Sequence, residues 1–306
     1  MITEKGFVLE NDVELPFVGF GTYKVNEEKI ILDALEAGYR HLDTARMYKN
    51  EKIIGNALKE SGIHRGKLFL TSKVWKTDMG YDNTLRSFEA TLDDLGVQYL
   101  DLFLIHWPQS SPDADWKPLL TETWKAMERL YDDCLVRAIG VSNHLPQHLM
   151  HILRNCNTRP MVNQLEFHPG YTQAATTSFC VNQGIQVEAW SPMGRARILE
   201  NPLVLELAEK YGKTPAQICL RFCLQNNVLP LPKSSSPERM KQNLELFDFD
   251  IELEDIFRLM SMPETGWSGQ HPEHFNMMQT KKGLPFGSPF LILFSDVLML
   301  SVPRYQ

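Results

Sequence analysis

Short apolar runs alternate with longer amphipathic segments along most of the chain. The runs LDLFLIH (100–106) and MVNQLEF (161–167) are mostly apolar, which is typical of parallel strands covered by helices on both faces. The alternation predicts eight strands, at Phe17–Thr22, His41–Ala45, Leu68–Val74, Leu100–His106, Val136–Asn143, Met161–Phe167, Gln186–Pro192 and Val228–Pro232.

A helical segment follows each predicted strand. In the first of them Ile30, Ala34 and Leu35 share one face, while Glu27 and Glu28 lie mostly elsewhere. Thr214 before Pro215 is a typical helix start, Asp82 is a second expected cap, and several segments end at glycine. The predicted helices are Glu27–Gly38, Asn50–Gly62, Asp82–Gly96, Leu119–Asp133, Leu145–Asn155, Thr172–Gly184, helices within Asn201–Asn227, and Ser236–Leu246.

Eight such units predict a closed (β/α)8 barrel, although alternation alone leaves a doubly wound sheet open. The first 16 residues predict a β-hairpin, with a two-residue turn at Asn11-Asp12, that closes the bottom of the barrel. Residues 1–280 are predicted to form one domain. Residues 281–306 are an atypical apolar extension whose run Phe290–Val302 is too short to span a bilayer, so we expect it to pack against something.

Composition and charge narrow the class of protein. The 306 residues are 43% hydrophobic and 23% charged, with a net charge of −7 and scattered Lys and Arg, which argues against a nucleic-acid partner. The five cysteines form no disulfide framework, and Cys219 and Cys223 are expected to be buried reduced thiols. No signal-peptide pattern opens the chain. We therefore expect a cytoplasmic protein without a membrane span, most simply a monomer.

Polar side chains stand at the C-terminal end of nearly every predicted strand, where barrel enzymes place their active sites. Taken singly, Asp43 and Lys73 are better explained as a structural ion pair, and His106 as a hydrogen-bonded loop residue. Their convergence on one rim predicts a functional site instead. The set comprises Asp43, Tyr48, Lys73, His106, Ser142, Asn143, Gln164, Trp190, Ser191, Lys233 and Ser234.

A tyrosine, lysine, aspartate and histidine without a Ser or Cys nucleophile suit proton donation to a carbonyl oxygen. A tyrosine with a pKa of about 10 is a poor acid at neutral pH. We expect the ammonium of Lys73 to lower the pKa of Tyr48, with Asp43 holding the lysine and His106 hydrogen-bonding the substrate oxygen. These residues alone do not name the hydride source.

Six ordered motifs resemble those of the aldo-keto reductase family, and the likeness runs from about residue 6 to residue 278. It is greatest to the small microbial branch of diketogluconate reductases, methylglyoxal-type reductases and prostaglandin F synthase-like enzymes. The resemblance implies a catalytic tetrad of Asp43, Tyr48, Lys73 and His106, with Tyr48 as the proton donor. The motifs are HLDTARMYKNE (41–51), LTSKVW (70–75), YLDLFLIHWP (99–108), VRAIGVSN (136–143), VNQLEFHP (162–169) and LPKSSSPERMKQN (231–243).

The same resemblance implies that NADPH is the cofactor and that an aldehyde or ketone is reduced to an alcohol. The nicotinamide would stack on Trp190, and Ser142, Asn143 and Gln164 would hydrogen-bond its carboxamide. The adenosine 2′-phosphate would contact Lys233, Ser234 and Arg239, the last at the start of a helix. Further cofactor positions are Thr22, Ser191, Met193 and Ser235, with Gln242 and Asn243 near the adenine.

The resemblance also places Tyr23, Trp75 and Trp107 in the wall of the substrate pocket, completed by the segment Trp267–Phe275 as an aromatic cup. Plain packing is the alternative role of these rings. The family needs no metal, and we expect the row of His144, His148 and His151 to be a solvated helix face.

Two alternative functions remain. The first is a cofactor-binding regulatory protein on the same fold, against which the intact tetrad speaks. The second is an unrelated barrel enzyme, such as a phosphate-binding isomerase that uses Lys73 and His106.

Overall fold

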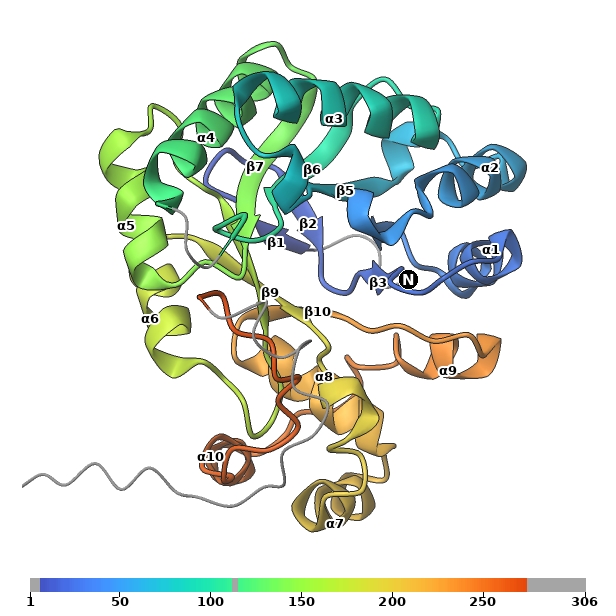
Figure 1. Cartoon of the computed structure of the whole chain (residues 1–306). Helices are drawn as coiled ribbons and strands as arrows, with labels where there is room; N and C mark the ends of the chain where they lie inside the picture. The colour runs from blue at the N-terminus through green and yellow to red at the C-terminus, as the bar shows by residue number, and fades with distance from the viewer. Residues whose placement is uncertain (1–5, 112–114, 274–306) are drawn as a thin grey trace, which may run out of the picture.

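The computed structural model describes residues 6–111 and 115–273. Eight parallel strands follow one another in the sheet in chain order, from β3 to β10 (Figure 1). Gly19 and Gly21 donate backbone hydrogen bonds to the carbonyls of Pro230 and Pro232, so the first strand also meets the last. The sheet is therefore a closed barrel, and the doubly wound alternative is wrong. The strands are β3 (Phe20–Gly21), β4 (His41–Asp43), β5 (Phe69–Val74), β6 (Leu100–Ile105), β7 (Val136–Ser142), β8 (Val162–Glu166), β9 (Gln186–Trp190) and β10 (Val228–Leu231).

Helices surround the barrel (Figure 1). Thr214 forms a capping box with Gln217, and Gly38, Gly62, Gly96 and Gly212 end helices in the left-handed conformation that glycine adopts without steric cost. The helices are α1 (Glu28–Ala37), α2 (Glu51–Ser61), α3 (Tyr81–Leu95), α4 (Trp116–Asp132), α5 (Pro146–Asn155), α6 (Ala174–Asn182), α7 (Pro202–Tyr211), α8 (Pro215–Gln225), α9 (Pro237–Gln242) and α10 (Leu253–Met260).

Two helix starts differ from the prediction. Asp82 is not a cap, because α3 begins at Tyr81 directly after Gly80. Helix α4 begins at Trp116, three residues before the expected start, since the Asp115 side chain accepts a hydrogen bond from the amide of Lys117. The earlier start of α4 brings Trp116 onto the neighbouring helix, α5.

The row of histidines near α5 is not a solvated face, so that expectation was wrong. His144 and His148 are buried, and His144 precedes the helix rather than lying on it. The ring of Trp116 packs edge-on against the buried His148 and against His151, which is half-buried and hydrogen-bonds Thr121. In the parts of the chain described, no three His, Cys, Asp or Glu side chains are grouped to hold a metal ion.

The predicted hairpin is present as β1 (Gly6–Val8) and β2 (Glu14–Pro16). Its apolar residues Leu9, Val13 and Leu15 pack against side chains of barrel strands, including Leu102 and Leu229, and so close the bottom of the barrel. The turn is one residue longer than expected. Glu10, Asn11 and Asp12 lie between the paired Leu9 and Val13, and Asp12 takes the left-handed conformation that a three-residue turn requires.

Two further expectations concern cysteines and membranes. Cys219 and Cys223 are buried as predicted, and all five cysteines are free of disulfides. Within residues 6–111 and 115–273 no helix is both long and apolar enough to cross a membrane. The expected packing of the extension 281–306 lies outside the described residues.

Candidate active site

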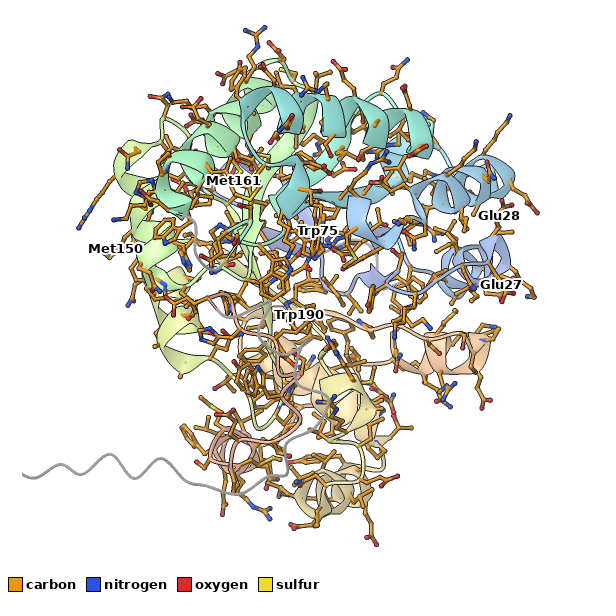
Figure 2. All side chains as sticks on the ribbon, in the orientation of Figure 1. Glu27, Glu28, Trp75, Met150, Met161 and Trp190 are labelled. Carbon is orange, nitrogen blue, oxygen red and sulfur yellow. The ribbon has the colours of Figure 1, made fainter. Side chains whose placement is uncertain are left out.

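A pocket of about 450 Å³ opens at the C-terminal ends of the barrel strands. Of the predicted tetrad, Asp43, Tyr48 and His106 line it directly. In Figure 2 the labelled Trp190 lies near the middle of the barrel, whereas Glu27 and Glu28 lie at its periphery. The strand ends therefore bring most of the predicted polar residues into one cavity, as a shared rim requires.

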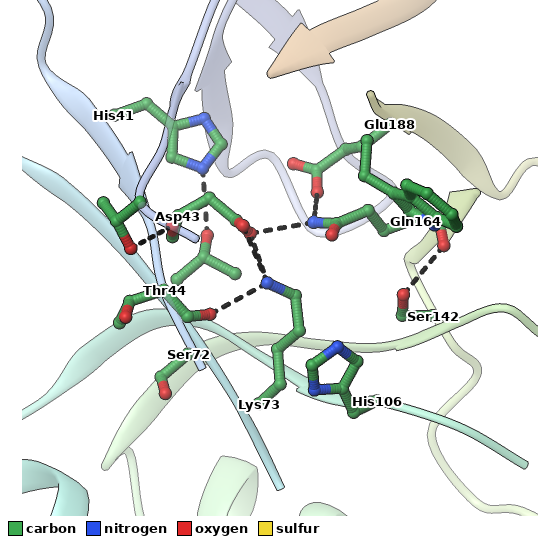
Figure 3. A network of polar contacts seen from close by, with 12 residues as sticks. His41, Asp43, Thr44, Ser72, Lys73, His106, Ser142, Gln164 and Glu188 are labelled. Atoms are coloured by element: carbon green, nitrogen blue, oxygen red, sulfur yellow. Dashed lines mark hydrogen bonds and ion pairs between the residues drawn. The ribbon is translucent and has the colours of Figure 1, made fainter. Parts of the chain in front are cut away.

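The Asp43–Lys73 pair lies at the base of this site. The Lys73 ammonium, fully buried, donates to the two Asp43 carboxylate oxygens at 2.7 and 2.8 Å and to the Thr44 carbonyl at 2.8 Å (Figure 3). These three bonds use all three of its hydrogens. Its nitrogen also lies 5.4 Å from the centre of the Tyr48 ring.

Tyr48 is carried by a short 3₁₀ turn (Arg46–Tyr48) between β4 and α2. The Arg46 guanidinium forms ion pairs with Glu51 on α2 and Asp94 on α3, which fixes one side of the turn. The buried Asn50 fixes the other side, because its amide donates to the carbonyls of Thr22 and Val25. Both anchors hold the phenol in the pocket.

The expected lowering of the pKa of Tyr48 is not found. Burial raises that pKa well above its ordinary value, and the charge of Asp43 adds to the effect. All three hydrogens of Lys73 are directed at Asp43 and Thr44, so none of them is left for the phenol oxygen. Burial and the nearby Lys73 lower the pKa of His106 well below its ordinary value, so this imidazole is neutral at neutral pH.

The predicted carboxamide residues form a connected group beside Trp190. The Asn143 side chain accepts a hydrogen bond from the Trp190 indole at 2.8 Å and donates to the His106 carbonyl at 3.0 Å. Ser142 donates to the Gln164 carbonyl at 2.9 Å. Asn143, Gln164 and Trp190 all line the pocket, and the indole is fixed in orientation by its bond to Asn143.

Glu188 is a site residue that the sequence analysis missed. It is fully buried on β9, and one of its oxygens accepts a hydrogen bond from the Gln164 side chain at 2.8 Å (Figure 3). The sequence could have indicated this residue, since Glu188 is the one charged residue in the strand Gln186–Trp190. Lys24, Arg195 and Gln270 also line the pocket without having been predicted.

The predicted aromatic wall is described in part, because the end of its segment Trp267–Phe275 lies outside the described residues. Tyr23 and Trp107 line the pocket, with the Tyr23 ring 5.0 Å from that of Tyr48. Trp75 packs edge-on against His106 at 5.0 Å but lines a neighbouring hollow beside Arg46, so the structure does not place it in the main pocket. Ser268 hydrogen-bonds Glu166 and thereby ties the segment after α10 to the barrel.

The remaining predicted cofactor residues lie along and beyond one side of the pocket. Thr22, Ser191, Met193 and Lys233 line it. The others follow Lys233 in the chain, outside that lining: Ser234 is buried, Ser235 and Arg239 are exposed, and Gln242 and Asn243 lie at the end of α9.

The sequence profile of the Aldo/keto reductase family matches residues 18–263. Glyoxal reductase of Bacillus subtilis is 43% identical over 269 residues, covering 87% of this chain and 95% of that protein. The 9,11-endoperoxide prostaglandin H2 reductase of Trypanosoma cruzi is 39% identical over 274 residues, covering 87% and 94%. An aldo-keto reductase solved in complex with NADPH superposes with a TM-score of 0.80 at 33% identity, covering 87% of this chain and 90% of that one.

These likenesses cover the whole barrel, and the reductases among the relatives belong to the small microbial branch that the motifs indicate. The chain is therefore a member of the aldo-keto reductase family of NADP-dependent oxidoreductases.

Proposed function

We propose that this protein reduces the carbonyl group of a small aldehyde or ketone to an alcohol, with Tyr48 as the proton donor. The observation that carries the proposal is the buried Asp43–Lys73 ion pair behind Tyr48, in a pocket that His106 also lines. When bound, NADPH supplies the hydride to the carbonyl carbon.

The protein residues then manage the proton. Because its pKa is raised, Tyr48 keeps its proton at neutral pH until the carbonyl oxygen gains negative charge. The positive charge of Lys73 stabilises the phenolate that remains after transfer. Neutral His106 donates a hydrogen bond to the same oxygen without supplying the proton itself.

The pocket suits a dinucleotide carrying phosphates. Its lining includes three cationic side chains, Lys24, Arg195 and Lys233, and the oriented indole of Trp190. We assign the nicotinamide to Trp190, with Ser142, Asn143 and Gln164 at its carboxamide. We assign the 2′-phosphate and adenine to the positions that follow along the chain, namely Lys233, Ser234, Ser235, Arg239, Gln242 and Asn243.

Other features of the proposal rest on the whole chain. We propose that residues 1–280 form one domain, which the single barrel built by the described strands and helices supports. We place the protein in the cytoplasm as a monomer without a nucleic-acid partner, because its cysteines are unpaired and acidic residues outnumber basic ones, 38 to 31.

The test is a Tyr48→Phe variant, assayed by NADPH oxidation over a panel of aldehydes, ketones and keto-sugars. We expect kcat to fall at least about 100-fold, while the Kd for NADPH stays within about twofold. Tyr23→Phe is the matched control, since its ring neighbours Tyr48 in the same pocket. Full activity of Tyr48→Phe would refute the role of Tyr48. Absence of turnover by the wild type despite tight NADPH binding would favour the regulatory alternative.

A further inference from the structure

Glu188 is a buried acid that the proton chemistry above does not use. It lies at the middle of β9, where its Cα pairs with Gln164 on β8 and Leu229 on β10. One carboxyl oxygen, Oε2, accepts a hydrogen bond from Gln164, and Oε1 has no partner among the residues described. A buried carboxyl with a single bond is costly, which calls for a reason to keep it there.

The Gln164 amide nitrogen is held between two carboxyl groups. It donates to Asp43 Oδ2 and to Glu188 Oε2, both at 2.8 Å, so each of its two hydrogens has an acceptor. A reversed amide would point its oxygen at the oxygens of Asp43, with no hydrogen between them. The two carboxyl groups therefore hold the nitrogen between Asp43 and Glu188 (Figure 3).

The oxygen of the same amide is left for the pocket. It takes part in neither hydrogen bond of the amide nitrogen, it is not among the fully buried polar atoms without a partner, and Gln164 lines the pocket. Asp43 also accepts two bonds from Lys73, whereas Gln164 is the one described partner of the Glu188 carboxyl. Glu188 is thus the acceptor dedicated to the orientation of Gln164.

We propose that Glu188 is a positioning residue that fixes the Gln164 amide, so that its oxygen accepts a hydrogen bond from the carboxamide NH₂ of the bound nicotinamide. The inference rests on the proposed cofactor site. It assigns to Glu188 a part in holding the nicotinamide half of the cofactor and none in holding the adenosine half.

The electrostatics agree with this role. Burial raises the pKa of Glu188 to about 8, the charge of Asp43 on β4 adds to it, and Gln164 and Lys73 on β5 oppose it. At neutral pH the uncharged form of the carboxyl group is therefore favoured, and its Oε2 still accepts the hydrogen bond from Gln164. A second negative charge beside Asp43, with Lys73 as the shared cation, is avoided.

The test compares binding of whole NADPH with binding of 2′,5′-ADP, which lacks the nicotinamide half. In Glu188→Leu, which keeps an apolar side chain in place of the acceptor, we expect the Kd for NADPH to rise about tenfold. The Kd for 2′,5′-ADP should stay within about twofold. Glu188→Gln, whose amide oxygen can accept from Gln164, should bind both like the wild type. Leu229→Ala is the matched control for loss of buried contacts on the neighbouring strand.

Equal weakening of both ligands in Glu188→Leu, or no change in either, would overturn the proposal. A double-mutant cycle with Gln164→Met gives a second readout. In the Gln164→Met background, Glu188→Leu should have no further effect on the Kd for NADPH. A persistent effect would also overturn the proposal. If Glu188→Leu does not fold, Glu188→Ala replaces it in the titrations with NADPH and with 2′,5′-ADP. Failure of the wild type to bind NADPH at all is a different result, and would overturn the proposed function itself.

Discussion

Replacing Asp43 by asparagine should strongly destabilise the protein before any question of activity arises. The Lys73 side chain is fully buried and Asp43 is only 3% exposed, so the ammonium would lose its counter-charge without gaining access to water. Breaking a buried pair by removing one partner costs about 3–5 kcal/mol of unfolding free energy. At roughly 2–4 °C for each kcal/mol in a domain of this size, Tm should fall by roughly 6–20 °C.

The assay is urea unfolding at neutral pH, followed by circular dichroism without cofactor, because a bound ligand would add its own stabilisation. The double variant Asp43→Asn/Lys73→Met should recover at least about half of the loss, since it removes the uncompensated charge. Asp33→Asn, which breaks the surface pair with the well-exposed Lys29, should cost under about 1 kcal/mol. A loss below about 1 kcal/mol for Asp43→Asn, or a double variant as unstable as the sum of its parts, would refute the reasoning.

Three further predictions test other parts of the structure. The raised pKa of Glu188, about 8 against an ordinary 4.5, means that the folded state holds a proton that the unfolded state releases. Unfolding free energy should therefore fall by a few kcal/mol as pH rises from about 4.5 to about 8, and Glu188→Gln should flatten this slope in urea titrations across that range. Arg239→Ala should weaken NADPH binding at least about tenfold and leave NADH binding unchanged, as measured by fluorescence titration; equal effects on both would remove Arg239 from the 2′-phosphate site. Gly55→Ala places a Cβ 2.6 Å from the Asp94 carbonyl oxygen, and should lower unfolding free energy by about 1–3 kcal/mol, whereas Gly62→Asn, whose Cβ meets nothing, should cost less than about 1 kcal/mol in the same denaturant assay.

The barrel and the location of its site follow from local sequence patterns. The strand Leu100–Ile105 is apolar apart from Asp101 because it is covered on both faces, and helices end at residues such as Gly38 because the left-handed turn favours glycine. The polar residues Asp43 and His106 come together because parallel strands all end at one rim. Each of these inferences needs only neighbours in the chain and the direction of the strands.

The tertiary structure decided what depends on burial and on partners distant in sequence. The pKa of Tyr48 rises rather than falls, because burial disfavours the charged phenolate and the nearby charge of Asp43 adds to the effect. The packing of the folded chain likewise directs the Trp75 side chain into the hollow beside Arg46.

The surroundings of buried polar groups were likewise decided by the tertiary structure. His148 is excluded from water by Trp116, which belongs to a different helix. Glu188 became a site residue only when β8 and β9 placed it beside Gln164, 24 positions away in the chain. The sequence by itself determined the barrel and the rim at which its polar residues meet, since both follow from periodicity. Solvent access and hydrogen-bond partners set the charge and orientation of those residues, and they exist only once the barrel is closed.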